Sequence, residues 1–233
     1  NAFINAKALL PPDSVLGAKI FYYDKPDILW FAGGSWNKEL NTLVHIGAGQ
    51  KDNAFNEFAE VDYVTGCALF ASAKTFNKVG LLDESFFLTY EETDWCYRAR
   101  KAGHKCIYVP EATLWHKVSS SFGGADSPLV NYFMVRNKLL WAKKHLPKQA
   151  MNRLHKENYQ TLRQIFLSSF VLPKTSASFL RRLVWAFASW KKTISRNLQD
   201  PITQSTLIAL RDYYFGRFGN CPPKVRALSS RKL

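Results

Sequence analysis

The sequence contains no apolar run long enough to cross a membrane as a helix. In its C-terminal half the longest uncharged stretch lies between Arg163 and Lys174 and holds ten residues, about half of the roughly 20 that a spanning helix needs. The first residues show neither the basic start nor the apolar core of a signal peptide, and they lack an initiator Met. We therefore expect no membrane-spanning helix and no secretory leader, and we expect the chain to be a fragment.

The chain has few cysteines, and their spacing matches no paired motif. The four cysteines, Cys67, Cys96, Cys106 and Cys221, form no CxxC pair, which argues against a zinc site, and they are too few for a disulfide scaffold of this size. We interpret them as reduced thiols of a cytoplasmic protein. Intrinsic disorder is also excluded, because 47% of the residues are hydrophobic and only 21% are charged.

Acidic residues are nearly absent from the C-terminal part of the chain. Residues 131–233 hold 20 Lys and Arg but only 3 Asp and Glu, whereas residues 1–130 hold 12 and 15. The two parts therefore differ in electrostatic character, and the basic one favours an anionic partner.

The N-terminal half alternates between strand and helix patterns. Two apolar runs around a Pro-containing turn predict two strands over Val15–Phe31, and the continuous apolar run Val61–Ser72 predicts a central strand buried on both faces. A short helix closed by Gly80 and an amphipathic helix over Glu91–Lys101 follow, and then a strand interrupted at Pro110. The pattern predicts an α/β fold with a mixed sheet.

Carboxylates are concentrated at the start of the second predicted helix, at Glu91, Glu92 and Asp94, and His116 follows the next strand. Three carboxylates within four residues repel one another, which raises at least one pKa if they are partly buried. Such a carboxylate can act as a general base, and an imidazole at a strand end can bind a divalent cation. From the residues alone a structural role is favoured, in which the carboxylates complement the helix dipole and Asp94 pairs with Arg98.

A series of short motifs appears in a fixed order along the chain. They are V-x-G-C-x-L (Val64–Leu69), V-G-x-x-D-E-x-F-F (Val79–Phe87), Y-E-E-x-D-x-C-x-R (Tyr90–Arg98), A-G (Ala102, Gly103), V-P-E-A (Val109–Ala112), His116 and Y-x-x-x-R-N (Tyr132–Asn137). In this order they resemble the second half of the catalytic domain of family-2 glycosyltransferases of the GT-A fold, above all rhamnosyltransferase-type enzymes of bacterial polysaccharide assembly. The resemblance covers about residues 15–145, with weaker agreement at 209–219.

The resemblance implies an inverting transfer of a sugar, rhamnose-like or another hexose, from a nucleotide-diphosphate sugar to a hydroxyl of a lipid-linked or polysaccharide acceptor. The family's base lies in the acidic motif, here Glu91 and Glu92, with Asp94 nearby. Many members carry Asp at the second position, where this chain has Glu92, so the resemblance favours Glu92 but leaves Glu91 open. We expect Glu91, Glu92 and His116 to meet at one cleft.

Further residues acquire roles through the same resemblance. His116 matches a position that can complete the coordination of a divalent metal, Mg²⁺ or Mn²⁺, and Arg136 could contact the diphosphate. Gly66, Cys67 and Asn137 complete the expected substrate-binding set. A surface position on its helix is the equally plausible alternative for Arg136.

One part of the family's pattern is missing. The nucleotide-binding β-α-β region and the Asp-x-Asp motif that open GT-A enzymes have no counterpart before Val15. The resemblance thus predicts that residues 1–126 are the C-terminal part of a GT-A catalytic domain, a partial Rossmann-like mixed sheet, followed by a basic helical region over 127–233. Such a fragment would be a poor or inactive catalyst by itself.

The sequence pattern of the basic region predicts two amphipathic helices within residues 158–198, separated by Pro173. Their apolar strip would contain Phe166, Phe170, Leu180, Val184, Phe187 and Trp190, bordered by Arg181, Arg182, Lys191 and Lys192. The strip either packs against the catalytic domain or attaches the protein to an anionic membrane, on the cytoplasmic face of the inner membrane of the cell envelope. A different class of function also remains, a noncatalytic basic module that binds an anionic membrane or nucleic acid. No RNA- or DNA-binding signature supports the nucleic-acid form.

Overall fold

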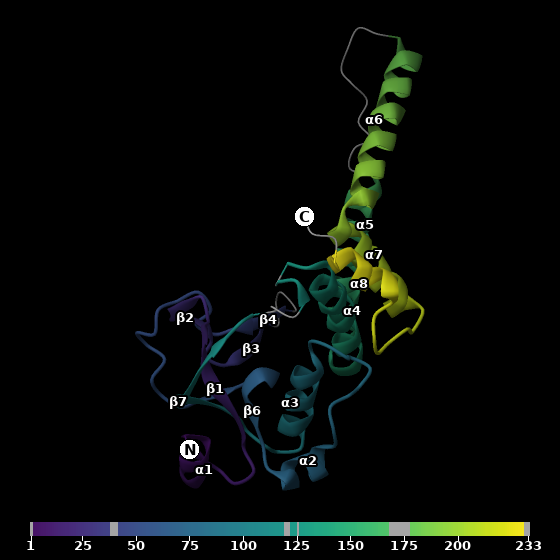
Figure 1. Ribbon diagram of the computed structural model, residues 1–233. Coiled ribbons are helices and arrows are strands. Elements are labelled where there is room, and N and C mark those ends of the chain that lie inside the picture. The colour runs from purple at the N-terminus through teal and green to yellow at the C-terminus, as the bar shows by residue number, and fades with distance from the viewer. Residues whose placement is uncertain (1, 38–41, 119–121, 125, 168–177, 231–233) are drawn as a thin grey trace. The chain divides into compact units, whose positions relative to one another are not determined.

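The computed structural model describes residues 2–37, 42–118, 122–124, 126–167 and 178–230. The chain forms two compact units (Figure 1). The first contains residues 1–125 and 218–220, and the second contains residues 126–217 and 221–233. The first unit is built on sheets and the second is helical.

The sheet of the first unit is organised around strand β1 (Val15–Tyr22), whose residues are almost all buried. β1 pairs in parallel with β7 (Cys106–His116) along most of its length, and antiparallel with β2 (Lys25–Phe31) and with the short β6 (Leu69–Phe70). β5 (Ala59–Val61) adds to the far edge of β7. The mixed sheet confirms the predicted α/β class and is consistent with a partial Rossmann-like GT-A fold.

A separate two-stranded sheet is formed by β3 (Gly34–Asn37) and β4 (Thr42–His45), which pair antiparallel. It follows β2 directly, and the backbone of Gly34 also bonds to Tyr63. The hairpin thereby brings β4 and its terminal His45 close to the segment that follows β5.

Strand β7 contains a bulge where the sequence predicts an interruption. Its register with β1 steps from Ala18 opposite Val109 to Lys19 opposite Thr113, so three residues of β7 have no direct partner there. Pro110 lies in this step, and proline has no amide hydrogen to donate to a ladder. The strand continues beyond the bulge and delivers His116 to its end.

The prediction of one central strand over Val61–Ser72 is wrong. The run contains the end of β5, a 3₁₀ turn η1 (Gly66–Ala68) and β6, which pair with different strands. Only its first part passes through the core: Val64 is fully buried, and a Cβ atom at Gly17 of β1 would lie 2.5 Å from its Cγ1, whereas Gly66 and Cys67 are exposed. A short apolar run cannot by itself distinguish a buried strand from a buried crossing segment.

Three helices accompany the sheets: α1 (Ala2–Leu9), α2 (Ala73–Val79) and α3 (Glu91–Lys101). The bounds of α3 agree with the prediction, and α2 ends at Gly80, whose φ of 86° favours glycine. Trp95 of α3 is fully buried and donates its indole hydrogen to the carbonyl of Gly80, at 2.7 Å. This bond fixes α3 against the end of α2.

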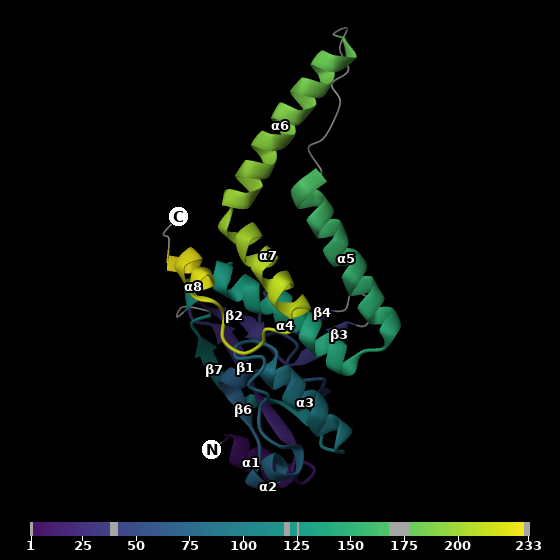
Figure 2. The same ribbon diagram turned by 90° about the vertical axis from the view of Figure 1, so that its right-hand side faces the viewer.

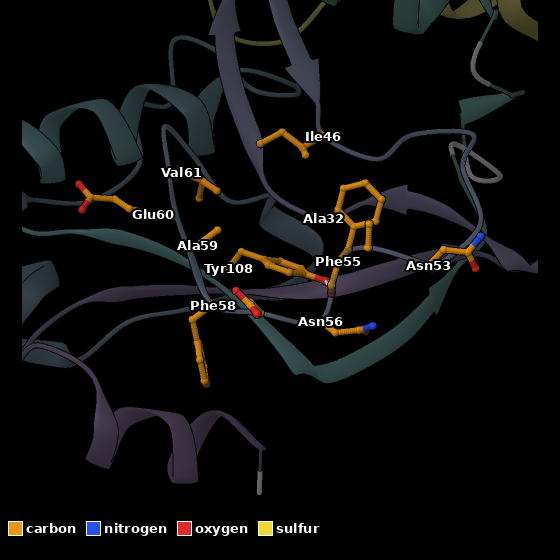
Figure 3. A pocket seen from close by; sticks show the side chains of 12 residues that line it. Ala32, Ile46, Asn53, Phe55, Asn56, Phe58, Ala59, Glu60, Val61 and Tyr108 are labelled. Atoms are coloured by element: carbon orange, nitrogen blue, oxygen red, sulfur yellow. Dashed lines mark hydrogen bonds between the residues drawn. The ribbon is translucent and has the colours of Figure 1, made fainter.

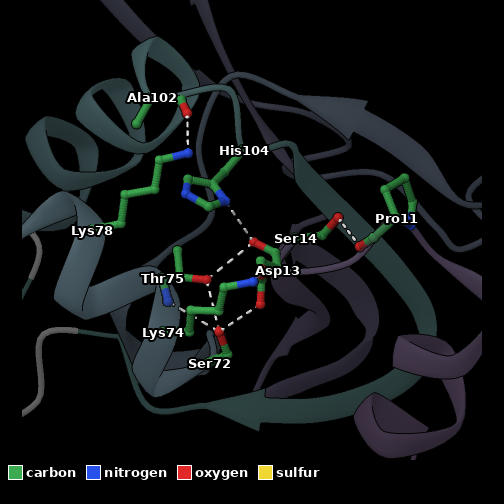
Figure 4. A network of polar contacts seen from close by, with 9 residues as sticks. All are labelled: Pro11, Asp13, Ser14, Ser72, Lys74, Thr75, Lys78, Ala102 and His104. Carbon is green, nitrogen blue, oxygen red and sulfur yellow. Dashed lines mark hydrogen bonds and ion pairs between the residues drawn. The ribbon is translucent and has the colours of Figure 1, made fainter.

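A network around Asp13 joins the entrance of β1 to α2 (Figure 4). Its carboxylate accepts a hydrogen bond from Ser72 at 3.1 Å and pairs with Lys74 at 2.9 Å. Its carbonyl accepts from Thr75, and His104 Nδ1 lies 3.0 Å from the same oxygen. Asp13 adopts a left-handed φ of 62°, so the network holds a conformation that a non-glycine residue seldom takes.

The described residues of the second unit form the helices α4 (Pro128–His145), α5 (Lys148–Leu167), α6 (Phe179–Gln199), α7 (Pro201–Tyr214) and α8 (Pro223–Ser230). Ser127 caps α4 and Asp200 caps α7 through side-chain bonds to amides of the first turn. No helix in the described ranges is long and apolar enough to span a bilayer.

The predicted pair of basic helices corresponds to α5 and α6, and Pro173 and Phe170 lie outside the described residues. One assignment to the apolar strip needs correction. Trp190 is only partly exposed and donates to the carbonyl of Phe166 of α5, at 2.6 Å. It therefore belongs to the contact between the two helices rather than to the exposed face of α6. Figure 2 shows the course of α5 and α6.

Candidate active site

The acidic motif lies at the N-terminus of α3, directly after a strained turn. Phe87, Thr89 and Tyr90 have φ values of 63°, 61° and 69°. Left-handed conformations of residues other than glycine cost on the order of 1–3 kcal/mol each and persist only where the surroundings impose them. Here Phe86 is fully buried and Tyr90 is 3% exposed, so both ends of the turn are anchored in the protein interior. Strain of this kind clusters at functional sites.

Glu91 and Glu92 follow this turn and carry unusual carboxylates. In each, Oε2 is shielded from solvent and has no hydrogen-bond partner among the described residues. Burial and the negative charge of Glu91 raise the pKa of Glu92 to about 7, although backbone amides, including that of Gly66, bond to the ionised form and oppose the rise. Burial also raises the pKa of Glu91. Glu92 thus exchanges a proton near neutral pH.

The turn η1 lies beside this carboxylate. A Cβ atom at Gly66 would lie 3.7 Å from Cβ of Glu92, an ordinary contact, so glycine is not required there for space. Cys67 is exposed, and its sulfur lies 3.8 Å from the hydroxyl of Thr65. The structure therefore brings Gly66 next to Glu92, as a shared site requires, and the substrate contacts of Gly66 and Cys67 stay predictions.

An aromatic series connects the surroundings of Glu92 with His116. The charge of Glu92 adds to burial in raising the pKa of Tyr63. The ring centroid of Tyr63 lies 6.2 Å from that of His45, which lies 4.8 Å from that of Trp30, and Trp30 lies 4.6 Å from His116. His116 and Glu92 thus belong to one connected region, and their convergence on a single cleft stays a prediction.

His116 has the properties of a single metal ligand. Its Nδ1 is buried without a hydrogen-bond partner in the described structure, and burial lowers its pKa, which favours the neutral imidazole that binds cations. No group of three or more His, Cys, Asp or Glu side chains close enough to hold a metal ion occurs in the described part of the chain. His116 therefore fits one coordination position, and further ligands would have to come from elsewhere.

Asp94 has a structural partner. Its carboxylate is fully buried and accepts from Nε of Arg98 at 2.8 Å, the ion pair that the spacing allows. Arg98 also donates to the carbonyls of Val79 and Leu81. The pair holds the loop after α2 against α3, and a catalytic role for Asp94 stays a prediction.

A shallow hollow of about 470 Å³ lies elsewhere in the first unit, along residues 53–61 (Figure 3). Tyr108 of β7 lines it and donates to the carbonyl of Phe55 at 2.9 Å, which holds the loop on the sheet. Neither Glu91, Glu92 nor His116 contributes to its lining, so this hollow is separate from the candidate site.

Comparison with known proteins yields partial relatives. The dTDP-rhamnosyl transferase RfbF of Shigella flexneri is 33% identical over 116 residues, 46% of this chain and 37% of that protein. The hexosyltransferase Agl10 of low-salt glycan biosynthesis in Haloferax volcanii is 46% identical over 41 residues, 18% of this chain and 13% of that protein. The N-acetylglucosaminyl-diphospho-decaprenol L-rhamnosyltransferase of Mycobacterium tuberculosis is 35% identical over 63 residues, 27% of this chain and 20% of that protein.

The chain is similar to rhamnosyltransferases and hexosyltransferases. The resemblance inferred from the ordered motifs is thereby confirmed. The chain spans between about one eighth and two fifths of the length of these curated relatives. No family model matches it.

Arg136 and Asn137, expected at the substrate in such transferases, lie in the helical unit. Arg136 is fully buried, and it donates to Asn137 Oδ1 at 3.0 Å and to the hydroxyl of Tyr132 at 3.1 Å. Tyr132 in turn donates to Asp212 of α7 at 2.9 Å. The alternative of a surface arginine is therefore wrong, and a contact with substrate phosphate stays a prediction.

Several features of the site gave no signal in the sequence. The left-handed turn before Glu91 contains no glycine, and the contact of Trp30 with His116 joins strands that are distant along the chain. The bond between Tyr132 and Asp212 brings the segments 132–137 and 209–219 together where α4 meets α7, a contact that no local pattern in the sequence indicated.

Proposed function

We propose that the chain is part of an inverting glycosyltransferase in which Glu92 is the general base. The observation that carries the proposal is the state of Glu92: a shielded, unpartnered carboxylate oxygen with a pKa of about 7, placed after a strained turn. The donor is a nucleotide-diphosphate sugar, rhamnose or a related hexose. The acceptor is a hydroxyl of a lipid-linked or polysaccharide glycan, as the names of the relatives suggest.

The reaction needs one base. Glu92 accepts the proton of the acceptor hydroxyl while the oxygen bonds to the anomeric carbon, and the bond to the nucleotide diphosphate breaks on the opposite face. Configuration inverts in one step without a covalent enzyme intermediate. A base is most effective when its pKa lies near the working pH, which Glu92 satisfies because burial and Glu91 oppose its ionisation.

His116 is proposed as one ligand of a divalent cation, Mg²⁺ or Mn²⁺. When bound, such a cation stabilises the negative charge of the departing diphosphate. The neutral imidazole and its unpartnered Nδ1 suit that position. Trp30, 4.6 Å away between ring centroids, limits the orientations that the imidazole can take.

We place the reaction in the cytoplasm. None of the four cysteines forms a disulfide bond, although Cys96 and Cys106 are neighbours in the interior. Neighbouring thiols that remain unbridged are typical of a reducing compartment.

The experiment uses the full natural protein that contains this chain, with dTDP-rhamnose as donor. Glu92→Gln keeps the shape of the side chain and removes the base, so transfer should fall by about 10²–10⁴-fold, the usual contribution of a general base. Donor binding, measured by calorimetry, should change little because the base acts on the acceptor.

Glu91→Gln is the matched control. It removes the charge that helps to raise the pKa of Glu92, and it should retain most of the transfer and shift the pH profile to lower pH. Transfer that survives in Glu92→Gln but is lost in Glu91→Gln would assign the base to Glu91, and transfer unchanged in both variants would refute the proposal.

A further inference from the structure

Helix α6 uses one face for contact with α5. Ala186 is buried, Trp190 donates to the carbonyl of Phe166, and Asn197 donates to the carbonyl of Ile165 at 3.0 Å. These three α6 residues follow one another at spacings of four and seven, so they share one side of the helix. Most other side chains of α6 are exposed.

A second face of α6 exposes large apolar side chains. Leu180, Val184 and Phe187 stand at positions i, i+4 and i+7 and are 74%, 65% and 53% exposed. We call these three residues the apolar strip. Lys191 stands on the same side of α6, eleven residues after Leu180, so the strip is confined to the first half of the helix. An exposed strip of this kind marks an interaction surface rather than an ordinary solvated face.

A basic face of α6 borders the apolar strip and joins its side of the helix at Lys191. The helix contains five Lys and Arg residues and no Asp or Glu. Lys191, Lys192 and Arg196, together with Thr193, Ser195 and Gln199, line a surface hollow of about 690 Å³. A row of cations with hydroxyl and amide donors beside them is suited to phosphate groups.

From these three faces we infer that α6 lies on an anionic lipid bilayer. The apolar strip enters the boundary between headgroups and acyl chains, and the basic face binds the lipid phosphates. A nucleic acid would satisfy the positive charge but would leave Leu180, Val184 and Phe187 exposed to water, so the bilayer is the partner that accounts for both faces. Attachment along the surface also agrees with α6 being too polar to span the membrane.

Attachment complements the proposed transfer, because it holds the enzyme at the surface where a lipid-linked acceptor would lie. The two proposals can fail separately. Vesicle binding requires no catalysis, and transfer to a water-soluble acceptor requires no vesicle.

The test measures co-sedimentation of the full 233-residue chain with phosphatidylcholine vesicles, with and without phosphatidylglycerol. We expect binding to the anionic vesicles only, weakened but not abolished by added salt, since screening acts on the charges and not on the apolar strip. Lys191→Gln with Lys192→Gln should lower the affinity about thirtyfold at low salt, given the usual contribution per basic residue near such a surface.

Two further variants make the result specific. Lys25→Gln with Lys51→Gln removes the same charge from exposed positions of the sheet unit and should leave the affinity unchanged within about twofold. Val184→Ser with Phe187→Ser alters only exposed side chains, so the helix should persist by circular dichroism, and the binding that remains at high salt should disappear.

Three outcomes would overturn the inference. They are equal binding to neutral and anionic vesicles, binding that neither α6 variant weakens, and tighter binding to duplex DNA than to anionic vesicles. The last would favour a nucleic-acid partner.

Discussion

Glu92 is a residue at which function and stability oppose one another. Its carboxyl group would have a pKa of about 4.5 in the unfolded chain, and in the folded protein burial and Glu91 raise that pKa to about 7. The folded protein therefore holds the proton more tightly than the unfolded chain between these values. By linkage, the free energy of unfolding falls as pH rises from about 4.5 to about 7 and is level beyond that range.

Removing the ionisable group should reverse this loss. We expect Glu92→Gln to be more stable than the natural chain at pH 8, by at most about 3 kcal/mol from the linkage relation, and the difference to shrink towards pH 5. Urea unfolding at both pH values measures it. The same variant is the one expected to lose transfer, so a gain in stability would separate loss of the base from misfolding. A pH-independent difference between the two proteins would show that Glu92 is not held in an environment that disfavours its charge.

At the scale of single elements, the turn before α3 sets the direction of the acidic motif. Phe87, Thr89 and Tyr90 keep left-handed backbone conformations although none is glycine. The side chain of Phe87 is half exposed, so replacing it removes little packing and tests mainly the backbone conformation of this residue.

We expect Phe87→Gly to be more stable than Phe87→Ala by about 1 kcal/mol. Both variants remove the ring, and only glycine relieves the clash of Cβ with the backbone at positive φ, partly offset by the greater freedom of glycine in the unfolded chain. Thermal unfolding of the two variants compares them directly. If alanine matched or exceeded glycine, residue 87 would not occupy the left-handed region in solution.

Elements specified by local signals were predictable, and those specified by distant contacts were not. The bounds of α3 follow from acidic residues in its first turn, basic residues in its last turn and Gly103 beyond its end. The hairpin of β1 and β2 follows from two apolar runs around a turn. The run at 61–72 was misassigned because burial on both sides arises equally in a strand and in a segment that crosses the core.

At the candidate site, Glu91, Glu92 and His116 could be selected from their order in the sequence. Their link through Trp30, His45 and Tyr63 required the fold.

At the scale of the molecule, the helical unit depends on a buried polar network. The hydroxyl of Tyr132 accepts from Arg136 and donates to Asp212, which joins α4 to α7 over a separation of 80 residues. Arg211, whose side chain is 45% exposed, also pairs with the buried carboxylate of Asp212, at 2.7 Å. The buried guanidinium of Arg136 is linked to the same carboxylate through the hydroxyl of Tyr132. Networks of this kind are costly to leave partly satisfied.

Tyr132→Phe removes only the shared hydroxyl. We expect the free energy of unfolding of the helical unit to fall by about 1–3 kcal/mol, because a buried donor and acceptor each lose a partner. Tyr214→Phe is the matched control: its hydroxyl bonds to His155 at an exposed position, and a change within about 0.5 kcal/mol is expected. Urea unfolding followed by circular dichroism at a helix wavelength compares the two. Equal losses in both variants would contradict the role of Tyr132 as the joint between α4 and α7.

The parallel pairing of β1 with β7 also has a consequence for synthesis on the ribosome. β7 is made about 90 residues after β1, while β2 and β6 cover only parts of the other edge of β1. Until Cys106–His116 emerges, a strand rich in buried apolar residues such as Val15, Leu16 and Ile20 has one long edge without its partner. An open apolar edge is a template for association with other chains. The nascent protein therefore passes through an interval in which this edge is open to other chains, and the interval ends when β7 pairs with β1.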